Sequence, residues 1–353
     1  MRISFVLSLM ALPAAWAAAQ PQSTSNSAGE NDLSQLYYIP NNQKPRVFVC
    51  TDILNEPDDQ ESVVRYLLYS NQFNTRALCT TTSTWLRNST HPEAVQHIVN
   101  AYRTVVNNLN QHVHPQNQYA PADIMTSLIT SGPTVYGKAA LEQPLSDGAS
   151  LLIERLQESE DPLWDDTGEW IRNGWPDIFW IASIHTFGNY DLATWQGMWT
   201  GLPDMVQKVS QPWIGQNIQV GPLGAVYPSR NVGAESDTPS FLCLIQNGLG
   251  DRDHPGYGSW GGRYGPINIG GVRWADTEDT FYYVQEGKNE TSNKATVARW
   301  RDHFQNDIAT RMQWTLSPSF ADGVHPPVPR INGTAGPAPI RMIVTPGSQV
   351  VRL

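Results

Sequence analysis

Residues 46–59 read RVFVCTDILNEPDD, a short apolar run that passes directly into an acidic loop. The apolar run at 47–50 is typical of a strand buried on both faces of a parallel sheet. After the loop, the pattern predicts a helix over 58–70. Its inner face is formed by four apolar residues at helical spacing: Val63, Val64, Leu67 and Leu68. The stretch therefore predicts a strand–loop–helix unit.

The alternation of predicted strands and helices continues along the chain. A second strand is expected at 77–82, and Pro92 opens a further helix at a position where proline is tolerated. The buried stripe of that helix is expected to consist of Val95, Ile98, Val99, Tyr102, Val105 and Val106. A helix over about 148–157 and a strand at 178–184 follow. This order predicts an α/β fold with a doubly wound, mostly parallel sheet, in which ligands bind beyond the carboxyl ends of the strands.

The loop after the first strand lies at such a carboxyl end. Its polar residues are Asp52, Asn55, Glu56, Asp58 and Asp59. Ca²⁺ takes about 6–8 oxygen ligands, mostly carboxylates, carbonyls and waters, and a cation relieves the repulsion between crowded carboxylates. The alternative is that Asp58 is a helix N-cap, with Glu61 completing a capping box. The two roles are compatible, because one carboxylate oxygen can cap while the other binds a metal.

Composition narrows the class of protein. The chain has 353 residues, of which 40% are hydrophobic, so it can bury a sizeable core without disulfides. Its formal net charge of −10 argues against nucleic acid or an anionic membrane as a partner and suits a protein that holds a cation. The three cysteines, Cys50, Cys79 and Cys243, lie in apolar runs, which predicts buried thiols, with a Cys50–Cys79 disulfide as the lesser alternative.

The N-terminus predicts secretion. Arg2, an apolar run at 3–12 and small residues at 14–19 are typical of a signal peptide over residues 1–19. Residues 20–45 are rich in Ser, Asn and Gln and are expected to form a flexible leader. Three glycosylation sequons, at Asn88, Asn289 and Asn332, agree with an extracellular protein. No later segment is long and apolar enough to span a bilayer.

The loop motif TDxxNEPDD at 51–59 resembles the opening of the nucleoside-hydrolase fold. It is closer still to a secreted family described as cellulose-binding with a nucleoside-hydrolase-like domain. Further similarity lies at 63–70, 80–87, 168–172, 193–197, 221–225, 237–242 and 258–264. The resemblance covers most of residues 46–314 and implies a nucleoside-hydrolase-like domain over 46–316.

The resemblance also implies roles for individual residues. Asp52, Asp59 and the distant Asp237 would bind Ca²⁺, and Asp58 would orient or deprotonate the attacking water. The residues expected to contact substrate are Asn55, Glu56 and Trp85. By itself, Asp237 also fits the N-cap of a helix that starts near Pro239. His185 and His254 are candidate donors to the leaving group, and the sequence favours neither.

Three features depart from the family pattern. Cys50 stands where nucleoside hydrolases usually have an aspartate. A strand and the helix after it are expected to be missing between Trp164 and Asp165. Residues 317–353 are rich in Pro and Gly, with strand-like runs at 340–344 and 350–353, and are expected to be the start of a β-sandwich that stops early. Such an incomplete sandwich leaves unpaired strand edges, which predicts a poorly stable chain.

Two classes of function follow. The first is a calcium-dependent hydrolase of N-glycosyl bonds, acting on a small nucleoside or carbohydrate substrate; an O-glycosidase with the same metal site is a variant of it. The second is a non-catalytic protein that binds cellulose or another carbohydrate during plant-polymer degradation. The aromatic residues expected to stack on sugars are Trp85, Trp195 and Trp260, although core packing is the commoner role of tryptophan.

Overall fold

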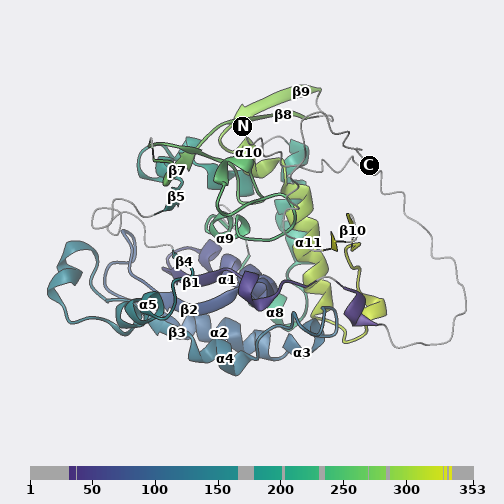
Figure 1. The fold of residues 1–353 in the computed structure, drawn as a ribbon, viewed down its shortest axis with the longest axis horizontal. Coiled ribbons are helices and arrows are strands. Elements are labelled where there is room, and N and C mark those ends of the chain that lie inside the picture. Colours follow the sequence, from purple (N-terminus) through teal and green to yellow (C-terminus); the bar gives the residue numbers. More distant parts are fainter. Residues whose placement is uncertain are drawn as a thin grey trace, which may run out of the picture.

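The central sheet of the protein consists of four parallel strands in the order β3-β2-β1-β4 (Figure 1). They are β1 (Arg46–Thr51), β2 (Asn74–Thr80), β3 (Ile129–Ser131) and β4 (Leu163–Asp165). The structure, a computed structural model, describes residues 32–36, 38–165, 179–200, 203–229, 235–268, 270–283, 287–328, 330–331 and 334–335. The parallel pairing of β1 and β2 confirms the predicted α/β class.

Helices cover both faces of this sheet. The helices are α1 (Pro57–Tyr69), α2 (Pro92–Arg103), α3 (Val106–Leu109), α4 (Ala122–Ser127) and α5 (Asp147–Gln157). Val47 points into the main core together with the apolar faces of α1 and α2. The next residue, Phe48, points to the other face and packs with Cys79 against Leu151 and Leu152 of α5. This alternation is why the continuous apolar run of β1 is buried on both sides.

The predicted boundaries of the first helix, 58–70, lie within one residue of those of α1, and the later ones are less accurate. Strand β2 begins at Asn74 and ends at Thr80, earlier at both ends than predicted. Helix α2 ends at Arg103, so Val105 and Val106 do not belong to its stripe, although both are buried. A turn at Thr104 and Val105 ends α2, and the short helix α3 begins at Val106.

The second half of the chain builds a layer of small elements above this sheet (Figure 1). Strand β5 (Trp180–Ala182) runs parallel to β7 (Arg273–Asp276), and β6 (Tyr264–Pro266) runs antiparallel to β7. A hairpin joins β8 (Asp279–Tyr283) to β9 (Lys288–Ser292). The helices are α7 (Gln211–Asn217), α8 (Gly221–Gly224), α9 (Thr238–Leu242), α10 (Ala295–Ala298) and α11 (Arg301–Trp314). Helices α9 and α11 both pack against α1.

Short 3₁₀ helices connect these elements: η1 (Leu33–Gln35), η2 (Asn41–Gln43), η3 (Ser70–Gln72), η4 (Gly137–Glu142), η5 (Ile184–Phe187), η6 (Tyr190–Leu192), η7 (Thr194–Met198), η8 (Pro203–Val209), η9 (Pro255–Tyr257) and η10 (Phe320–Asp322). The strand predicted at 178–184 is β5, which is shorter than expected. It does not extend the central sheet, because its pairing partner β7 comes from much later in the chain.

The expected gap in the α/β alternation falls inside β4. Trp164 and Asp165 both belong to this short strand, and Asp165 is in register with Phe48 of β1. The position beside β1 is therefore filled by a three-residue strand. Residues 166–178, where the next helix of the family pattern would begin, lie outside the described residues.

Other expectations concern the chain ends. The predicted signal peptide at 1–19 and the predicted strand-like runs at 340–344 and 350–353 lie outside the described residues. The last described residues form a hairpin of β10 (Arg330–Ile331) and β11 (Thr334–Ala335). Ile39 is fully buried, so order begins before Arg46, where it was predicted to start. Within the described residues, no helix has the length and apolar character needed to cross a membrane.

Cysteines and sequons can be compared with their predictions directly. Cys79 is buried as expected, whereas Cys50 and Cys243 are half-buried. Cys50 and Cys79 are register partners on β1 and β2, yet neither forms a disulfide in the structure. The sequon residues Asn88 and Asn289 are exposed and so accessible to glycosylation, which stays a prediction; Asn332 lies outside the described residues.

Candidate functional site

The acidic loop occupies residues 52–56, between the end of β1 and the start of α1. The Asn55 backbone N–H donates a hydrogen bond to the Asp52 carbonyl at 3.0 Å, which closes a tight turn. Leu54, inside this turn, has a φ of 75°, in the left-handed region that a side chain with a Cβ rarely adopts. Backbone strain of this kind gathers at functional sites.

Helix α1 begins at Pro57, and Glu56 is its N-cap residue without a capping side-chain hydrogen bond. The proposed capping box is therefore wrong: Asp58 lies within the first helical turn. The Glu61 carboxylate instead accepts a hydrogen bond from the Glu235 backbone N–H at 3.0 Å. Proline begins the helix without loss because the first N–H of a helix has no intrahelical partner. The carboxylates of the first turn are thus available for another role.

Asp58 and Asp59 are the two buried carboxylates of this turn, with exposed fractions of 7% and 3%. Each is oriented by a hydroxyl group. Thr51 Oγ1, at the last residue of β1, donates to Asp59 Oδ1 at 2.7 Å. Ser236 Oγ donates to Asp58 Oδ2. Two hydroxyls from different parts of the chain therefore fix the directions of the two carboxylates.

Segment 235–238 lies next to this turn because side-chain contacts hold it against α1. The buried Arg65 guanidinium pairs with the Glu235 carboxylate, and Tyr227 Oη also donates to Glu235 Oε1, at 2.6 Å. Thr238 Oγ1 donates to Ser62 Oγ at 2.9 Å. Glu235 itself has a φ of 54°, a second strained position next to the site. These contacts bring the segment back onto the first turn of α1.

Asp237 is the N-cap residue of α9, but its side chain makes no capping hydrogen bond. Its carboxyl group instead lies within hydrogen-bonding reach of Asp59. The structure therefore brings together Asp59 and Asp237, as the resemblance implied, and the capping alternative for Asp237 does not hold. Asp52 is close enough for its charge to act on Asp59 as well.

The electrostatics of the cluster show an excess of negative charge. Burial, followed by the charges of Asp52 and Asp58, raises the pKa of Asp59 to about 7, although the hydrogen bonds with Thr51 and Asp237 act to lower it. Burial and the charge of Asp58 also raise the pKa of Glu56. Among the ion pairs of the described residues, none joins Asp52, Asp58 or Asp59 to a basic side chain. A divalent cation would supply the missing positive charge.

Two observations test whether these residues fit Ca²⁺. The donor set consists of carboxylate oxygens, which hard cations prefer, and its charge is uncompensated. In the part of the chain that the structure describes, however, no three His, Cys, Asp or Glu side chains lie close enough to hold a metal ion as they stand. The residues therefore fit the cation in chemistry and charge, whereas the arrangement shown does not bring three of their side chains close enough together to hold it.

The residues expected to contact substrate lie at the same edge of the sheet. The Thr81 N–H donates to the Thr51 carbonyl at 2.8 Å, so the loops after β2 and β1 start side by side. Trp85, in the loop after β2, is 75% exposed. Asn55 is half-buried and Glu56 is exposed on the acidic loop. All three can therefore reach a ligand bound beyond the carboxyl ends of the strands.

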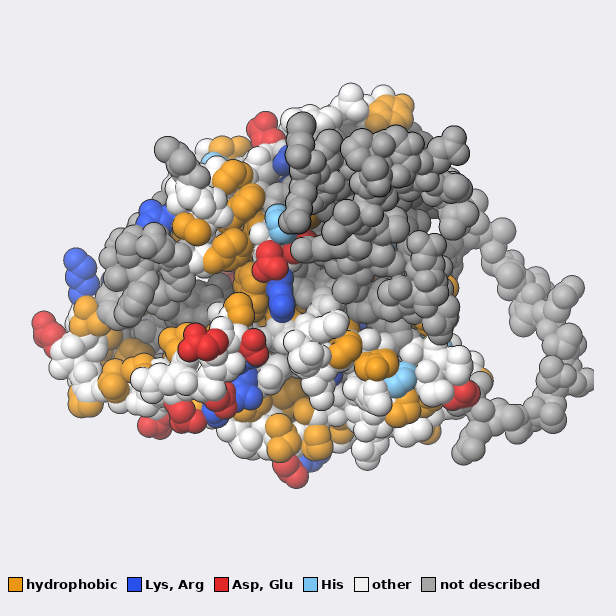
Figure 2. All heavy atoms as spheres, in the orientation of Figure 1, with side chains coloured by type: hydrophobic (Ala, Val, Ile, Leu, Met, Phe, Trp, Pro, Cys, Tyr) orange, Lys and Arg blue, Asp and Glu red, His pale blue; other side chains and the backbone are white. Residues whose placement is uncertain are grey.

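The other aromatic candidates serve packing. Trp195 is half-buried, and its Nε1 donates to Thr186 Oγ1 at 2.8 Å. Trp260 is half-buried against Phe304. Of the three tryptophans suggested for sugar stacking, only Trp85 has an exposed ring. On the face drawn in Figure 2, acidic and basic side chains are interspersed among the described residues.

Each of the two candidate histidines lies against an acidic partner of its own. His185 Nδ1 lies 3.0 Å from Asp276 Oδ2, at the ends of β5 and β7. His254 Nδ1 lies 3.3 Å from Asp251 Oδ2. Among the described hydrogen bonds, none joins either histidine to Asp58 or Asp59. Sequence reasoning did not find Thr51 and Ser236, although each stands next to a predicted metal ligand, Asp52 and Asp237.

Comparison with known proteins agrees with this architecture. No curated protein matches the chain. A solved structure with a similar fold is described as a nucleoside hydrolase-related hypothetical protein from Saccharophagus degradans that is associated with carbohydrate metabolism. It is 22% identical, with a TM-score of 0.64, and the similarity covers 84% of this chain and 77% of that chain. At this identity the likeness establishes the fold.

A family model described as "Cellulose-binding Sde182, nucleoside hydrolase-like domain" matches residues 46–164 and 165–264. The two matched segments meet between Trp164 and Asp165, the position at which the sequence predicts a missing unit. Together they span more than half of the 353 residues and include the whole acidic loop, Ser236 and Asp237. This protein therefore belongs to the family of cellulose-binding, nucleoside hydrolase-like domains.

Proposed function

We propose that this protein is a secreted, calcium-dependent hydrolase of N-glycosyl bonds in nucleoside-like compounds. One observation carries the proposal: the buried carboxylates Asp58 and Asp59 lie with Asp52 and Asp237 at the carboxyl end of a parallel sheet, and among the ion pairs of the described residues none joins Asp52, Asp58 or Asp59 to a basic side chain. The nucleoside hydrolase-like character of the family supports the type of reaction.

Asp52, Asp59 and Asp237 would hold the calcium ion. When bound, Ca²⁺ supplies positive charge and lowers the pKa of a water molecule in its coordination shell. Asp58 is suited to accept the proton of the attacking water, because Ser236 occupies its Oδ2 and leaves Oδ1 for the water. Glu56 and the other carboxylates provide negative charge where the sugar becomes oxocarbenium-like.

The test measures release of free base from a panel of nucleosides. Asp58→Asn keeps the shape and the Ser236 contact but removes the proton acceptor, so kcat should fall by about 10²–10⁴-fold. Asp123→Asn, at an exposed carboxylate on α4, is the matched control and should leave kcat unchanged. Chelation of calcium should abolish release and added CaCl₂ should restore it. A wild-type rate of base release by Asp58→Asn would show that Asp58 is not the general base.

A second function, non-catalytic binding of cellulose, is favoured by the exposed ring of Trp85. A tryptophan that is 75% exposed presents a flat apolar face to a sugar ring. The name of the family, which refers to cellulose binding, supports this alternative. Under it, Trp85→Ala should lose retention on cellulose, whereas Asp58→Asn and Leu141→Ala, a control at another exposed apolar side chain, should retain it. Retention that survives Trp85→Ala would exclude this binding mode.

A further inference from the structure

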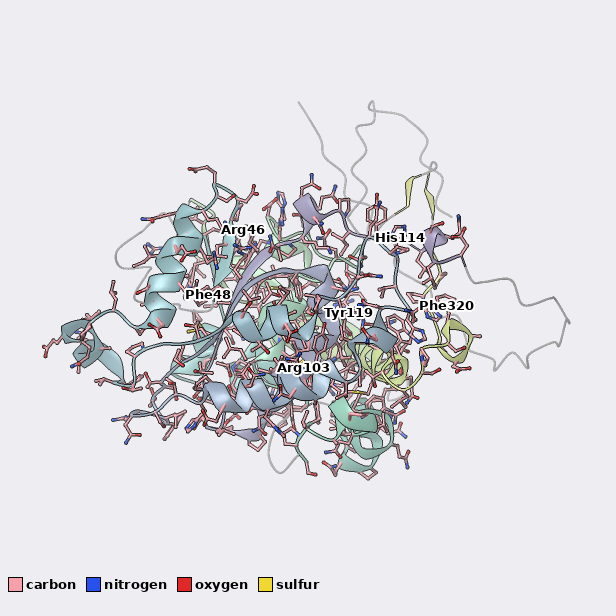
Figure 3. The ribbon with its side chains drawn as sticks, turned by 90° about the horizontal axis from the view of Figure 1, so that it is seen from below. Arg46, Phe48, Arg103, His114, Tyr119 and Phe320 are labelled. Atoms are coloured by element: carbon pink, nitrogen blue, oxygen red, sulfur yellow. The ribbon has the colours of Figure 1, made fainter. Side chains whose placement is uncertain are left out.

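The hairpin of β8 and β9 contains a glycosylation sequon, Asn289-Glu290-Thr291, to which the proposed function gives no role. Figure 1 shows this hairpin at the outer edge of the layer above the central sheet, next to α10. Figure 3 views the molecule from below, with α2 and its labelled Arg103 towards the viewer. A group attached to the hairpin therefore lies on the opposite side of the molecule from α2.

The register of the hairpin places the sequon beside an aromatic residue. Asn289 is the register partner of Tyr282, and Thr291 is the register partner of Thr280. Directly opposed residues of an antiparallel pair have Cβ atoms about 4.5–5.5 Å apart, and residues two apart in a strand share a face. The hydroxyl oxygens of Thr280 and Thr291 lie 2.7 Å apart, which confirms the shared face. Asn289 and Tyr282 are therefore neighbours on one face of the hairpin.

This face of the hairpin is turned to solvent. Asn289 and Thr291 are exposed, whereas Glu290 between them is half-buried, so the strand alternates between an outer and an inner face. Tyr282 is 59% exposed. A sugar attached to Asn289 therefore reaches the Tyr282 ring from solvent, without any movement of the protein.

The Tyr282 side chain extends along β9 and not away from the edge of β8. Its hydroxyl oxygen lies 3.7 Å from the position that a Cβ would occupy at Gly287, the residue directly before β9. Gly287 has a φ of 64°, a conformation that favours glycine. Because glycine has no side chain, the surroundings of the ring on this side stay open.

A sugar ring suits this position physically. The C–H groups of a pyranose form an apolar face, which packs on an exposed aromatic ring. In the described chain, β8 and β9 form a sheet of two strands that packs against α10. A two-stranded hairpin has little stability of its own, and its edges can pair with other chains. A sugar held by both strands stabilises the hairpin from its outer face.

We propose that Asn289 is N-glycosylated and that its first N-acetylglucosamine packs on the ring of Tyr282. In the modification, Asn289 Nδ2 forms a bond to C1 of the sugar and loses one proton. The bond from C1 to the pyrophosphate of a lipid-linked oligosaccharide breaks, and the lipid pyrophosphate leaves. The proposal rests on the secretion included in the proposed function and is independent of calcium binding and hydrolysis.

The first measurement is the occupancy of the site. The full chain is expressed in a eukaryotic secretion host, and its peptides are analysed by mass spectrometry. We expect a glycan on Asn289 in most molecules recovered from the medium. Secreted chains with an unmodified Asn289 would overturn the proposal and leave secretion intact. Chains retained in the cell without glycans would contradict both.

The second measurement tests the contact with Tyr282. Asn289→Gln removes the glycan and Tyr282→Leu removes the ring, and each should lower the melting temperature by about 1–3 °C. The double variant should lose less than the sum, because both changes remove the same contact. Tyr190→Leu, at a tyrosine on η6 that is 52% exposed, is the matched control, and its effect should add to that of Asn289→Gln. Additive effects of Asn289→Gln and Tyr282→Leu would overturn the contact.

Trimming the glycan with an endoglycosidase to a single N-acetylglucosamine gives a readout without any variant. The melting temperature should stay that of the untrimmed protein, because the contact involves the first sugar. A crystal structure of the trimmed protein should show this sugar against the Tyr282 ring. A melting temperature that falls to that of Asn289→Gln on trimming, or a sugar directed away from Tyr282, would overturn the proposal.

Discussion

Asp237 lies within hydrogen-bonding reach of Asp59, although one residue begins a helix late in the chain and the other belongs to the first turn of α1. The contact exists because Arg65 and Glu235 form a buried ion pair farther along α1. That pair anchors the segment before α9, so that Ser236 and Asp237 return to the start of α1. A local acidic loop thereby gains a carboxylate from a distant part of the sequence.

Removing the Asp237 carboxylate should weaken calcium binding without harming the fold. Asp237 is exposed and makes no capping bond, so Asp237→Asn removes one cation ligand and relieves repulsion with Asp59. We expect the calcium affinity to fall by about tenfold or more, with an unchanged or higher melting temperature in chelator. Calorimetric titration with CaCl₂ measures the calcium affinity, and a thermal unfolding curve measures the melting temperature. Equal calcium affinity in the variant and wild type would show that Asp237 is not a ligand.

Calcium binding should release a proton at an unusually high pH. The pKa of Asp59 is raised to about 7, chiefly by burial, so near neutral pH a calcium ion must displace its proton. The affinity should fall by about tenfold for each pH unit below about 7, whereas an ordinary carboxylate site weakens only near pH 4. Titrations between pH 5 and 8 measure the slope. A calcium affinity that does not change between pH 5 and 8 would contradict the release of a proton from Asp59.

The same pKa has a consequence for the cation-free protein. Because the folded pKa of Asp59 lies above its unfolded value of 3.8, its contribution to stability is full below that value and is lost as the pH rises through about 7. In chelator, Asp59→Asn should therefore gain stability relative to wild type between pH 5 and 8. Urea denaturation at several pH values measures the difference in the free energy of unfolding between Asp59→Asn and wild type. A difference that stays constant between pH 5 and 8 would contradict the raised pKa of Asp59.

Separating Arg65 from Glu235 should destabilise the whole domain. Arg65 is fully buried and Glu235 is 2% exposed, so Arg65→Met leaves a buried carboxylate without its partner. Breaking such a pair costs about 3–5 kcal/mol. The double variant Arg65→Met/Glu235→Met should lose less than the sum of the single variants. Arg76→Met, which breaks a pair with the half-exposed Glu158, is the control and should cost less than about 1 kcal/mol.

The aromatic cluster near the C-terminal end of the described chain should make stability depend on pH. His112 Nε2 donates to the Ser317 carbonyl at 2.8 Å, so its Nδ1 accepts from His325 Nε2 at 3.0 Å. Burial and the neighbouring His112 lower the pKa of His325 to about 4. The contribution of His325 is present above its unfolded pKa of 6.5 and is lost as the pH falls towards 4.

His325→Phe should keep the stacking on Phe320, whose ring centroid lies 3.6 Å away, and remove this titration. The stability of the variant should therefore fall less than that of wild type between pH 7 and 4, while the two profiles run parallel above pH 7. Urea midpoints across this range measure the slopes, and equal slopes below pH 6.5 would contradict the role of His325.

Local pattern was sufficient for the elements whose partners are close in sequence. The apolar run of β1 and the helical stripe of α1 predict both elements nearly to the residue, because burial on a regular period leaves a direct trace in residue type. The strand β4 and the placement of β5 could not be predicted. They are short, and only a distant partner strand makes them extended.

The candidate site divides in the same way. The acidic loop and its place after a buried strand follow from residues 46–59 alone, because strand, turn and helix signals succeed one another without a gap. The sequence alone could not decide between a capping and a ligating role for Asp58 and Asp237, since both roles use the same residue type. Tertiary structure removed the capping role for both side chains: the pairing of Arg65 with Glu235 turns Ser236 towards Asp58 and Asp237 towards Asp59, while metal binding stays a proposal. A contact between distant segments depends on how whole elements pack, and no short stretch of sequence records that.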